Sequence, residues 1–316
     1  MVLLGTEADG PHVVFTLRVD LPGRGTPRGV LRMLAATVAR QNCAAVFVAV
    51  IGGTRPKFAG SPPKAVRQLI QECGELDVQV RDVLWAAELA KGAEWFRLGG
   101  RPESGTLPDP AESPLAAHLA AAGEVTYADR EELERMMAPG DPEVLRRRAE
   151  LVNDRIDEAL ADDDDLPPYG LEAVELLDRW LAEATRGRPR FTDEDVAEIC
   201  LALSDPLVRD AAFGFAHHGD PKVAERLWTA LLPEVPDPEA AEVAVLLAHT
   251  ALLTGRHALI GVALDRALRA WPGHQVAVAF RAAVVAGYEP ERLASWFAEG
   301  TRRAVAELTG FDPTLN

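Results

Sequence analysis

The chain has 316 residues, 48% of them hydrophobic and 26% charged, which suits an ordinary globular protein large enough for two domains. Its formal net charge is −16, from 49 acidic and 33 basic residues. So negative a surface repels phosphate backbones and disfavours general binding to nucleic acids or anionic membranes. The three cysteines are odd in number and far apart, which argues against a disulfide framework and against a cysteine-based zinc site. The sequence shows neither a signal peptide nor an apolar run of the ~20 residues that a membrane span needs, so we expect a cytoplasmic protein.

The first part of the chain alternates predicted strands and helices. Its most apolar stretch is Ala44–Ile51, which contains only Ala, Val, Ile and Phe and is followed by two glycines. Such a run predicts a strand inside a parallel or mixed sheet, covered on both faces. Further strands are predicted at Val2–Leu4, His12–Asp20, Val78–Ala86 and Glu94–Leu98, and helices at Arg28–Gln41 and after Ser61-Pro62. This order is typical of an α/β sandwich. Gly99–Pro114, rich in Gly and Pro, is predicted to be a loop.

The remainder of the chain reads as helical. Short helices are predicted at Pro114–Ala122 and Asp129–Met137, then a long one at Asp141–Asp162, followed by the acidic run Asp162–Asp165. Beyond Gly170 no strand is predicted, and Gly or Pro separates each predicted helix from the next. We therefore expect an α/β domain with a mixed sheet flanked by helices at 1–140. A connecting helix and acidic linker follow at 141–169, and an all-α domain of stacked helical hairpins at 170–316.

One helix pair in this second domain has the spacing of a tetratricopeptide repeat. The matching positions are small or aliphatic and end in a proline: Ala244, Leu247, Ala248, Ala251, Ile260, Leu264, Ala267 and Pro272. The large aromatic residues of that repeat are absent. The match therefore supports tetratricopeptide-like hairpins without establishing a peptide-binding groove.

The clearest ligand-site candidate is Gly52-Gly53-Thr54-Arg55, directly after the apolar strand. Open α/β sheets bind ligands beyond the carboxyl ends of their strands, and these residues offer backbone N–H groups, a hydroxyl and a guanidinium to a small anion such as phosphate. The segment matches neither the dinucleotide fingerprint nor the P-loop pattern, and plain chain reversal is the alternative. Arg18 and Asp20 share one face of a neighbouring strand. They reach the same crevice if the two strands run parallel, although a structural salt bridge is the favoured explanation for them.

A second group of polar residues surrounds the helix predicted at Pro206–His217. Arg209, Asp210 and His217 are candidates for contacts with a partner, and Asp205 and Arg209 are spaced for an ion pair across one helical turn. His217-His218-Gly219 predicts a helix end, with Gly219 in the left-handed position after it. Adjacent histidines point in different directions on a helix, so we expect no metal site, and no motif calls for a cofactor.

Several sequence blocks together resemble the DUF4192 family, which is common in actinobacteria. They are Thr16–Pro22, Gly105-Thr106, Asp109-Pro110, Ser113-Pro114, Asp129–Leu133, Asp195-Val196, Leu207–Asp210, Leu227-Trp228 and Gly255 through Leu268 to Pro272. The chain departs from the family in two respects. Members usually carry an apolar segment before the first strand, where this chain starts inside that strand. They also carry paired cysteines, where this chain has Arg101-Pro102. The family's name records an unknown function, so the resemblance implies a fold and no chemistry.

These patterns favour a non-enzymatic interaction or scaffold protein that uses the surface of its helical domain to hold another protein or a second copy of itself. The alternative is an enzyme that binds a small ligand or nucleotide at the end of strand 44–51. DNA contact through Arg146–Arg148 is a third hypothesis, which the overall charge opposes.

Overall fold

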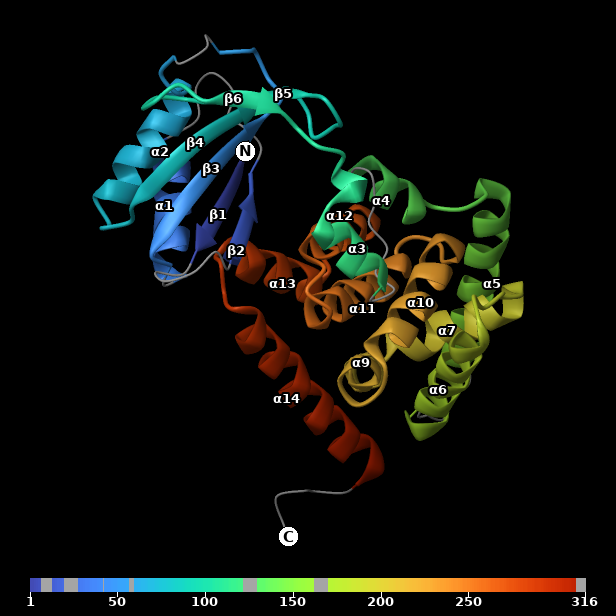
Figure 1. The fold of residues 1–316 in the computed structure, drawn as a ribbon. Coiled ribbons are helices and arrows are strands. Elements are labelled where there is room, and N and C mark those ends of the chain that lie inside the picture. The colour runs from blue at the N-terminus through green and yellow to red at the C-terminus, as the bar shows by residue number, and fades with distance from the viewer. Residues whose placement is uncertain are drawn as a thin grey trace. The chain divides into compact units, whose positions relative to one another are not determined.

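A computed structural model describes residues 1–6, 13–19, 28–41, 43–56, 60–121, 130–161 and 170–310. The chain forms two compact units, Met1–Thr126 and Tyr127–Asn316. The first contains a mixed six-stranded sheet with helices, and the described elements of the second are helices (Figure 1). The predicted order, an α/β domain followed by a helical one, is therefore confirmed.

The sheet of the first unit has the strand order β2-β1-β3-β4-β5-β6. Its strands are β1 (Val2–Thr6), β2 (Val13–Arg18), β3 (Ala45–Ile51), β4 (Val80–Ala86), β5 (Glu94–Arg97) and β6 (Ser104–Thr106). β3 and β4 are parallel, whereas every other neighbouring pair is antiparallel. The apolar strand predicted from Ala44–Ile51 is thus β3, and it lies in the interior of the sheet.

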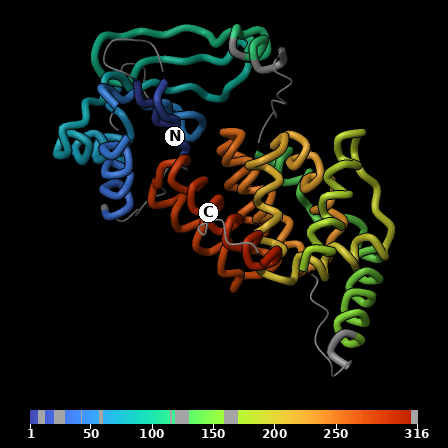
Figure 2. Tube along the Cα trace, turned by 90° about the horizontal axis from the view of Figure 1, so that it is seen from below, coloured from blue at the N-terminus to red at the C-terminus, as the bar shows by residue number. Residues whose placement is uncertain are grey.

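The core of this unit lies on one face of the sheet. Helices α1 (Arg28–Arg40) and α2 (Lys64–Gly74) pack side by side (Figure 2) and share one buried cluster with Val46, Val48 and Val50 of β3. The alternate side chains of β3, those of Phe47, Ala49 and Ile51, are only half-buried. The expectation that β3 is fully covered on both faces is therefore wrong. An apolar strand needs only one packed face to hold it in a sheet.

Aromatic rings cover one glycine of β1 and one of β6. A Cβ atom at Gly5 would lie 2.0 Å from Cε1 of Phe15, its partner across β1 and β2. In the same way, a Cβ at Gly105 would lie 2.9 Å from Nε1 of Trp95, its partner across β5 and β6. β6 falls within the stretch predicted to be a loop. Its residues Ser104–Thr106 have no apolar alternation, and pairing with the Trp95 strand makes them a strand.

Two short helices end the first unit, and the described elements of the second unit are all helices. The first unit ends with the 3-10 helix η1 (Pro110–Glu112) and helix α3 (Pro114–Ala121). The second unit contains α4 (Arg130–Met136), α5 (Pro142–Ala161), α6 (Gly170–Arg186), α7 (Asp193–Ser204), α8 (Pro206–Ala212), α9 (Gly214–His218), α10 (Pro221–Leu231), η2 (Leu232–Glu234), α11 (Ala240–Leu253), α12 (His257–Ala270), α13 (Gln275–Val285) and α14 (Pro290–Thr309).

Polar caps determine where several of these helices begin. Thr192 and Asp195 form the capping box of α7. Asp205 and Asp220 accept backbone N–H groups at the starts of α8 and α10, each followed by a proline. His274 does the same for α13 through Nδ1, which accepts the N–H of Ala277 at 3.1 Å.

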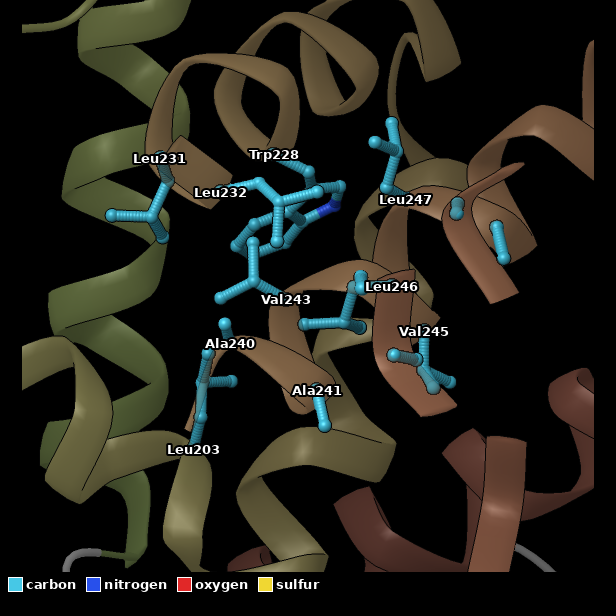
Figure 3. Close-up of a cluster of buried hydrophobic side chains, with 14 of the residues drawn as sticks. Leu203, Trp228, Leu231, Leu232, Ala240, Ala241, Val243, Val245, Leu246 and Leu247 are labelled. Atoms are coloured by element: carbon cyan, nitrogen blue, oxygen red, sulfur yellow. The ribbon is translucent and has the colours of Figure 1, made fainter. Parts of the chain in front are cut away.

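Helix α11 is the centre of the second unit. Nearly all its residues from Ala240 to Leu252 are buried, as expected for a helix enclosed by neighbours on all sides. It packs against α10, α12 and α14. Figure 3 shows its side chains Val243, Leu246 and Leu247 grouped with the fully buried ring of Trp228 from α10.

Within the described residues, no helix combines the length and the apolar character that crossing a bilayer requires.

Candidate functional site

The second unit contains a pocket with a volume of about 350 Å³ between α8, α13 and α14. Aromatic and aliphatic side chains form most of its lining, and Asp210 and Gln275 are its two polar side chains. The full lining consists of Asp210, Phe213, Gln275, Val276, Ala279, Phe280, Leu293, Trp296, Phe297 and Gly300. This volume is at the small end of ligand sites and suits one bulky apolar group.

A glycine within α14 leaves room for the hollow. A Cβ atom placed on Gly300 would meet no heavy atom within 4 Å. A glycine inside a helix costs about 0.5–1 kcal/mol relative to alanine, so its place in the middle of α14 is unfavourable for the helix alone. One turn earlier, α14 presents Trp296, whose side chain lines the pocket and is 51% exposed.

The inner wall of the pocket is a cluster of packed rings. The centroid of Phe297 lies 4.6 Å from that of Phe213 and 4.9 Å from that of Phe280. Behind these rings, the imidazole of His249 lies 4.6 Å from Phe297 and 4.9 Å from Phe213. Rings in contact on several sides hold one another in place, so the wall is fixed by packing.

His249 pairs with His217 behind this wall. Their Nε2 atoms are 3.1 Å apart, so one ring donates to the other. His249 is fully buried, and within the part of the chain that the structure describes its Nδ1 has no hydrogen-bond partner. Burial lowers the pKa of His249 to about 3, with a smaller contribution from His217, and burial also lowers the pKa of His217. Both rings are therefore neutral near pH 7.

A row of charged side chains leads to the polar edge of the pocket. Oδ1 of Asp210 accepts from Nε of Arg209 at 2.9 Å and lies 2.8 Å from its second terminal nitrogen. Arg209 also lies 3.6 Å from Oε2 of Glu242, which is 3.0 Å from Nε2 of His274. These contacts connect α8, α11 and the start of α13, and they hold Asp210 at the pocket.

The ion pair predicted between Asp205 and Arg209 is wrong. Asp205 instead accepts the N–H of Leu207 at 2.8 Å and caps α8. Arg209 instead contacts Asp210 and Glu242. The structure does bring the three predicted contact residues of this region to one place, because Asp210 lines the pocket, Arg209 holds Asp210, and His217 pairs behind the aromatic wall.

The helix end at His217-His218-Gly219 lies where the sequence predicts it, with a different role for the glycine. α9 ends at His218, but Gly219 has φ −112° and is extended, so the left-handed conformation predicted for it is wrong. A Cβ at Gly219 would lie 2.7 Å from the carbonyl oxygen of Phe215. Glycine is needed there because the backbone passes so close.

Several groups at the glycine-rich end of β3 are already paired with neighbouring residues of the sheet. Gly52 and Gly53 adopt φ +75° and +74°, which glycine alone tolerates well. The N–H of Gly52 donates to the carbonyl of Ala86 at 2.9 Å, and its carbonyl accepts from Nε1 of Trp85 at 3.0 Å. The guanidinium of Arg55 lies 2.6 Å from the carboxylate of Glu94. Two of the groups predicted to bind an anion are thus already paired, whereas Thr54 is exposed.

Arg18 lies at the same edge of the sheet as this strand end. β2 and β3 are both antiparallel to β1, so they run in the same direction, and Val2 of β1 pairs with both Arg18 and Ala49. The side chain of Arg18 is exposed. Asp20, its predicted companion, lies outside the described residues.

The three consecutive arginines of α5 are all paired with acids. Arg146 contacts Glu143 and Glu150, and Arg147 contacts Asp193. Arg148 is buried, where it contacts Asp193 and Glu234 and donates to the carbonyl of Phe191. These contacts neutralise the cations on which DNA binding would depend. Within the described parts of the chain, no three His, Cys, Asp or Glu side chains gather as metal ligands would.

Sequence reasoning missed most of the pocket. Its lining residues Phe213, Phe297 and Gly300, and His249 behind them, are not among the residues that the sequence patterns single out. The local signal in the sequence is the pair of adjacent aromatic residues Trp296 and Phe297, followed about one helical turn later by Gly300. Which other helices meet that face depends on contacts between distant segments.

Comparison with known proteins places the chain in a family. No curated protein and no solved structure matches it. The family described as Domain of unknown function (DUF4192) matches residues 1–291, which is most of the chain and spans both units. The protein therefore belongs to the DUF4192 family.

Proposed function

We propose that this protein is a non-enzymatic binding module whose helical unit holds a protein partner at the pocket between α8, α13 and α14. The observation that carries the proposal is an apolar hollow of about 350 Å³ with a half-exposed tryptophan, Trp296, in its lining. Large aromatic residues beside a pocket are typical anchors of protein interfaces. An exposed apolar surface of this kind otherwise costs solubility.

The chemistry of the lining supports binding by burial. Rings and aliphatic side chains cover most of the surface, so an apolar group that enters leaves water and gains contacts. The polar side chains of the lining, Asp210 and Gln275, can orient the bound group. His249, whose pKa changes most among the histidines, lies behind Phe213 and Phe297 instead of in the lining.

The surface around the pocket offers further contacts to a partner. Tyr288, 39% exposed, lies 5.5 Å from Trp296 between ring centroids, and the guanidinium of Arg292 lies 4.8 Å from the ring of Tyr288. This group of aromatic rings and one cation extends the apolar surface beyond the hollow. A peptide segment of several residues can cover both.

The proposal includes stacked helical hairpins of the tetratricopeptide type. In its support, α11 and α12 are separated by three residues and pack along their lengths. The aliphatic residues of the predicted repeat, among them Leu247, Ile260 and Leu264, are buried. Stacked hairpins provide the extended surfaces on which such proteins bind partners.

A peptide selection tests the binding function directly. A displayed library of random dodecapeptides is selected on the full-length protein, and the recovered peptides are measured against two variants. Gly300→Leu places a side chain in the pocket where a Cβ meets no atom within 4 Å. Gly261→Leu, in α12, is the matched control, because its Cβ also meets no atom within 4 Å and it does not line the pocket.

We expect selected peptides to bind the wild type and Gly261→Leu equally and to bind Gly300→Leu at least about tenfold more weakly, the loss of one buried apolar contact. Circular dichroism checks that both variants stay folded. The proposal fails if no peptide is enriched, or if the enriched peptides bind Gly300→Leu as tightly as the control.

A further inference from the structure

We infer that the partner of this pocket is a basic segment, which inserts one large apolar side chain between α13 and α14 and places a lysine or arginine against Asp210. This inference rests on the proposed binding function and adds the chemistry of the partner and its direction in the site. Three features of the helical unit carry it: the free carboxylate oxygen of Asp210, the local charge balance, and the distribution of charge between the two units.

Asp210 supplies the charge within the described lining. Both contacts from Arg209 reach its Oδ1 atom, and among the described residues Oδ2 takes part in no hydrogen bond. The side chain is 33% exposed. A carboxylate oxygen at the edge of an apolar pocket is a strong acceptor for a donor that arrives with the ligand, above all for a charged one.

The groups behind Asp210 leave a net negative charge at this end of the pocket. One guanidinium, Arg209, is shared between the carboxylates of Asp210 and Glu242. Two carboxylates thus share one guanidinium, and Nε2 of His274 lies 3.0 Å from Oε2 of Glu242. A cation on the ligand therefore completes the local balance.

The same sign holds over the whole helical unit. Residues 127–316 contain 36 acidic and 20 basic residues, a formal net charge of −16, whereas residues 1–126 contain 13 of each. The entire net charge of the chain thus belongs to the unit that holds the pocket. Its field attracts basic partners and repels acidic ones before contact is made.

The two ends of the pocket differ, which gives the bound segment a direction. The guanidinium of Arg292 lies 6.0 Å from the ring of Trp296, so a second cation is disfavoured at that end. The carboxylate of Asp210 in the lining is the group that accepts it. The apolar side chain fills the space between, against Phe213, Phe280 and Phe297, whose ring faces also tolerate a nearby cation.

The test uses the peptides selected on the full-length protein. Each lysine or arginine in the tightest peptide is replaced by glutamine, and the dissociation constants are measured for the wild type, Asp210→Asn and Asp178→Asn. Asp178 is exposed on α6 and does not line the pocket, so its variant removes the same unit of charge elsewhere. We expect one replacement to weaken binding to the wild type and to Asp178→Asn about fivefold, and to leave binding to Asp210→Asn unchanged.

A second measurement needs no variant. Binding of the unmodified peptide to the wild type should weaken as NaCl is raised from 50 to 500 mM, and the glutamine peptide should respond less. The inference is overturned if the selected peptides carry no basic residue beside the apolar one, or if glutamine costs the same against Asp210→Asn and Asp178→Asn. If either result occurs while Gly300→Leu still fails to bind the peptides, the proposed binding function remains intact. A library that yields no binder overturns both the binding function and the basic partner.

Discussion

The two units of this protein differ in whether the segment most typical of a ligand site is open to a ligand. In the sheet unit, the glycine-rich end of β3 has the sequence of a ligand site, yet Ala86, Trp85 and Glu94 already pair with its backbone and its arginine. In the helical unit, α14 reads as an ordinary amphipathic helix, yet Gly300 leaves a hollow in its inner face. Glycines free a backbone to turn, but an open site also requires that neighbouring elements leave space and unpaired groups.

The largest expected effect on the free energy of unfolding comes from a charged side chain buried in the helical unit. Arg148→Ala removes a buried guanidinium that contacts Asp193, Glu234 and two backbone carbonyls. We expect the free energy of unfolding to fall by about 3 kcal/mol, because breaking a buried ion pair leaves its partners unpaired. Urea unfolding followed by circular dichroism measures it.

Arg146→Ala on the same helix is the control, because Arg146 is exposed and solvent screens its ion pairs, so the substitution should have a much smaller effect on the free energy of unfolding. Equal effects of the two substitutions would contradict the role assigned to Arg148.

The histidine pair behind the pocket should make the helical unit sensitive to acid. Burial lowers the pKa of His249 from 6.5 to about 3 in the folded protein, so below pH 6.5 the unfolded chain binds a proton that the folded chain excludes. Its contribution to stability is complete above pH 6.5 and declines as pH falls toward 3, by up to about 1.4 kcal/mol per pH unit. Urea unfolding at pH 7.0, 6.0 and 5.0 follows the decline.

His249→Leu should flatten this dependence between pH 6.5 and 5, and His118→Gln, an exposed histidine of the sheet unit, should leave it unchanged. The lowered pKa of His217 acts in the same direction, so some slope should persist in His249→Leu. A slope equal to that of the wild type would contradict the burial of a neutral His249.

Two glycines should respond to alanine with opposite signs. Gly300→Ala should raise the melting temperature, because alanine stabilises a helix interior by about 1 kcal/mol and its Cβ meets no atom within 4 Å. Gly140→Ala should lower it, because a Cβ there would lie 2.7 Å from the carbonyl oxygen of Pro233. Differential scanning calorimetry distinguishes them, and a loss of stability in Gly300→Ala would mean that the hollow is filled.

The smallest effect is expected at the end of β3. Arg55 and Glu94 are both 63% exposed, so Arg55→Ala should change the free energy of unfolding by less than about 1 kcal/mol. A thermal-shift panel of phosphate and nucleotides should leave the wild type unchanged. If a nucleotide raises the melting temperature of the wild type and fails to do so for Arg55→Ala, the ligand site lies in the sheet unit.

The local pattern of the sequence predicts most of the fold. Apolar alternation or apolar runs predict the strands from β1 to β5, whereas β6 has neither and depends on the ring of Trp95 above Gly105. The helix predicted at Pro206–His217 is divided into α8 and α9 near Gly214, where a Cβ would lie 2.9 Å from Cγ2 of Thr301 on α14. Such a close approach between distant segments leaves no trace in local spacing.

The candidate site is predicted less well for the same reason. Arg209, Asp210 and His217 attract attention because charged residues and histidines are conspicuous in a helix. The pocket they border consists mainly of apolar residues from α13 and α14, which are indistinguishable in the sequence from core positions. Whether an apolar side chain fills the core or lines a pocket depends on how the three helices pack against one another.

The central claim is that the helical unit, and not the strand end of the sheet, binds the partner. Hydrogen–deuterium exchange of the full-length protein, with and without a selected peptide, tests it most directly. We expect slower exchange in 275–280 and 293–300, where α13 and α14 line the pocket, and unchanged exchange in 51–55. Slower exchange in 51–55, with α13 and α14 unaffected, would contradict the claim.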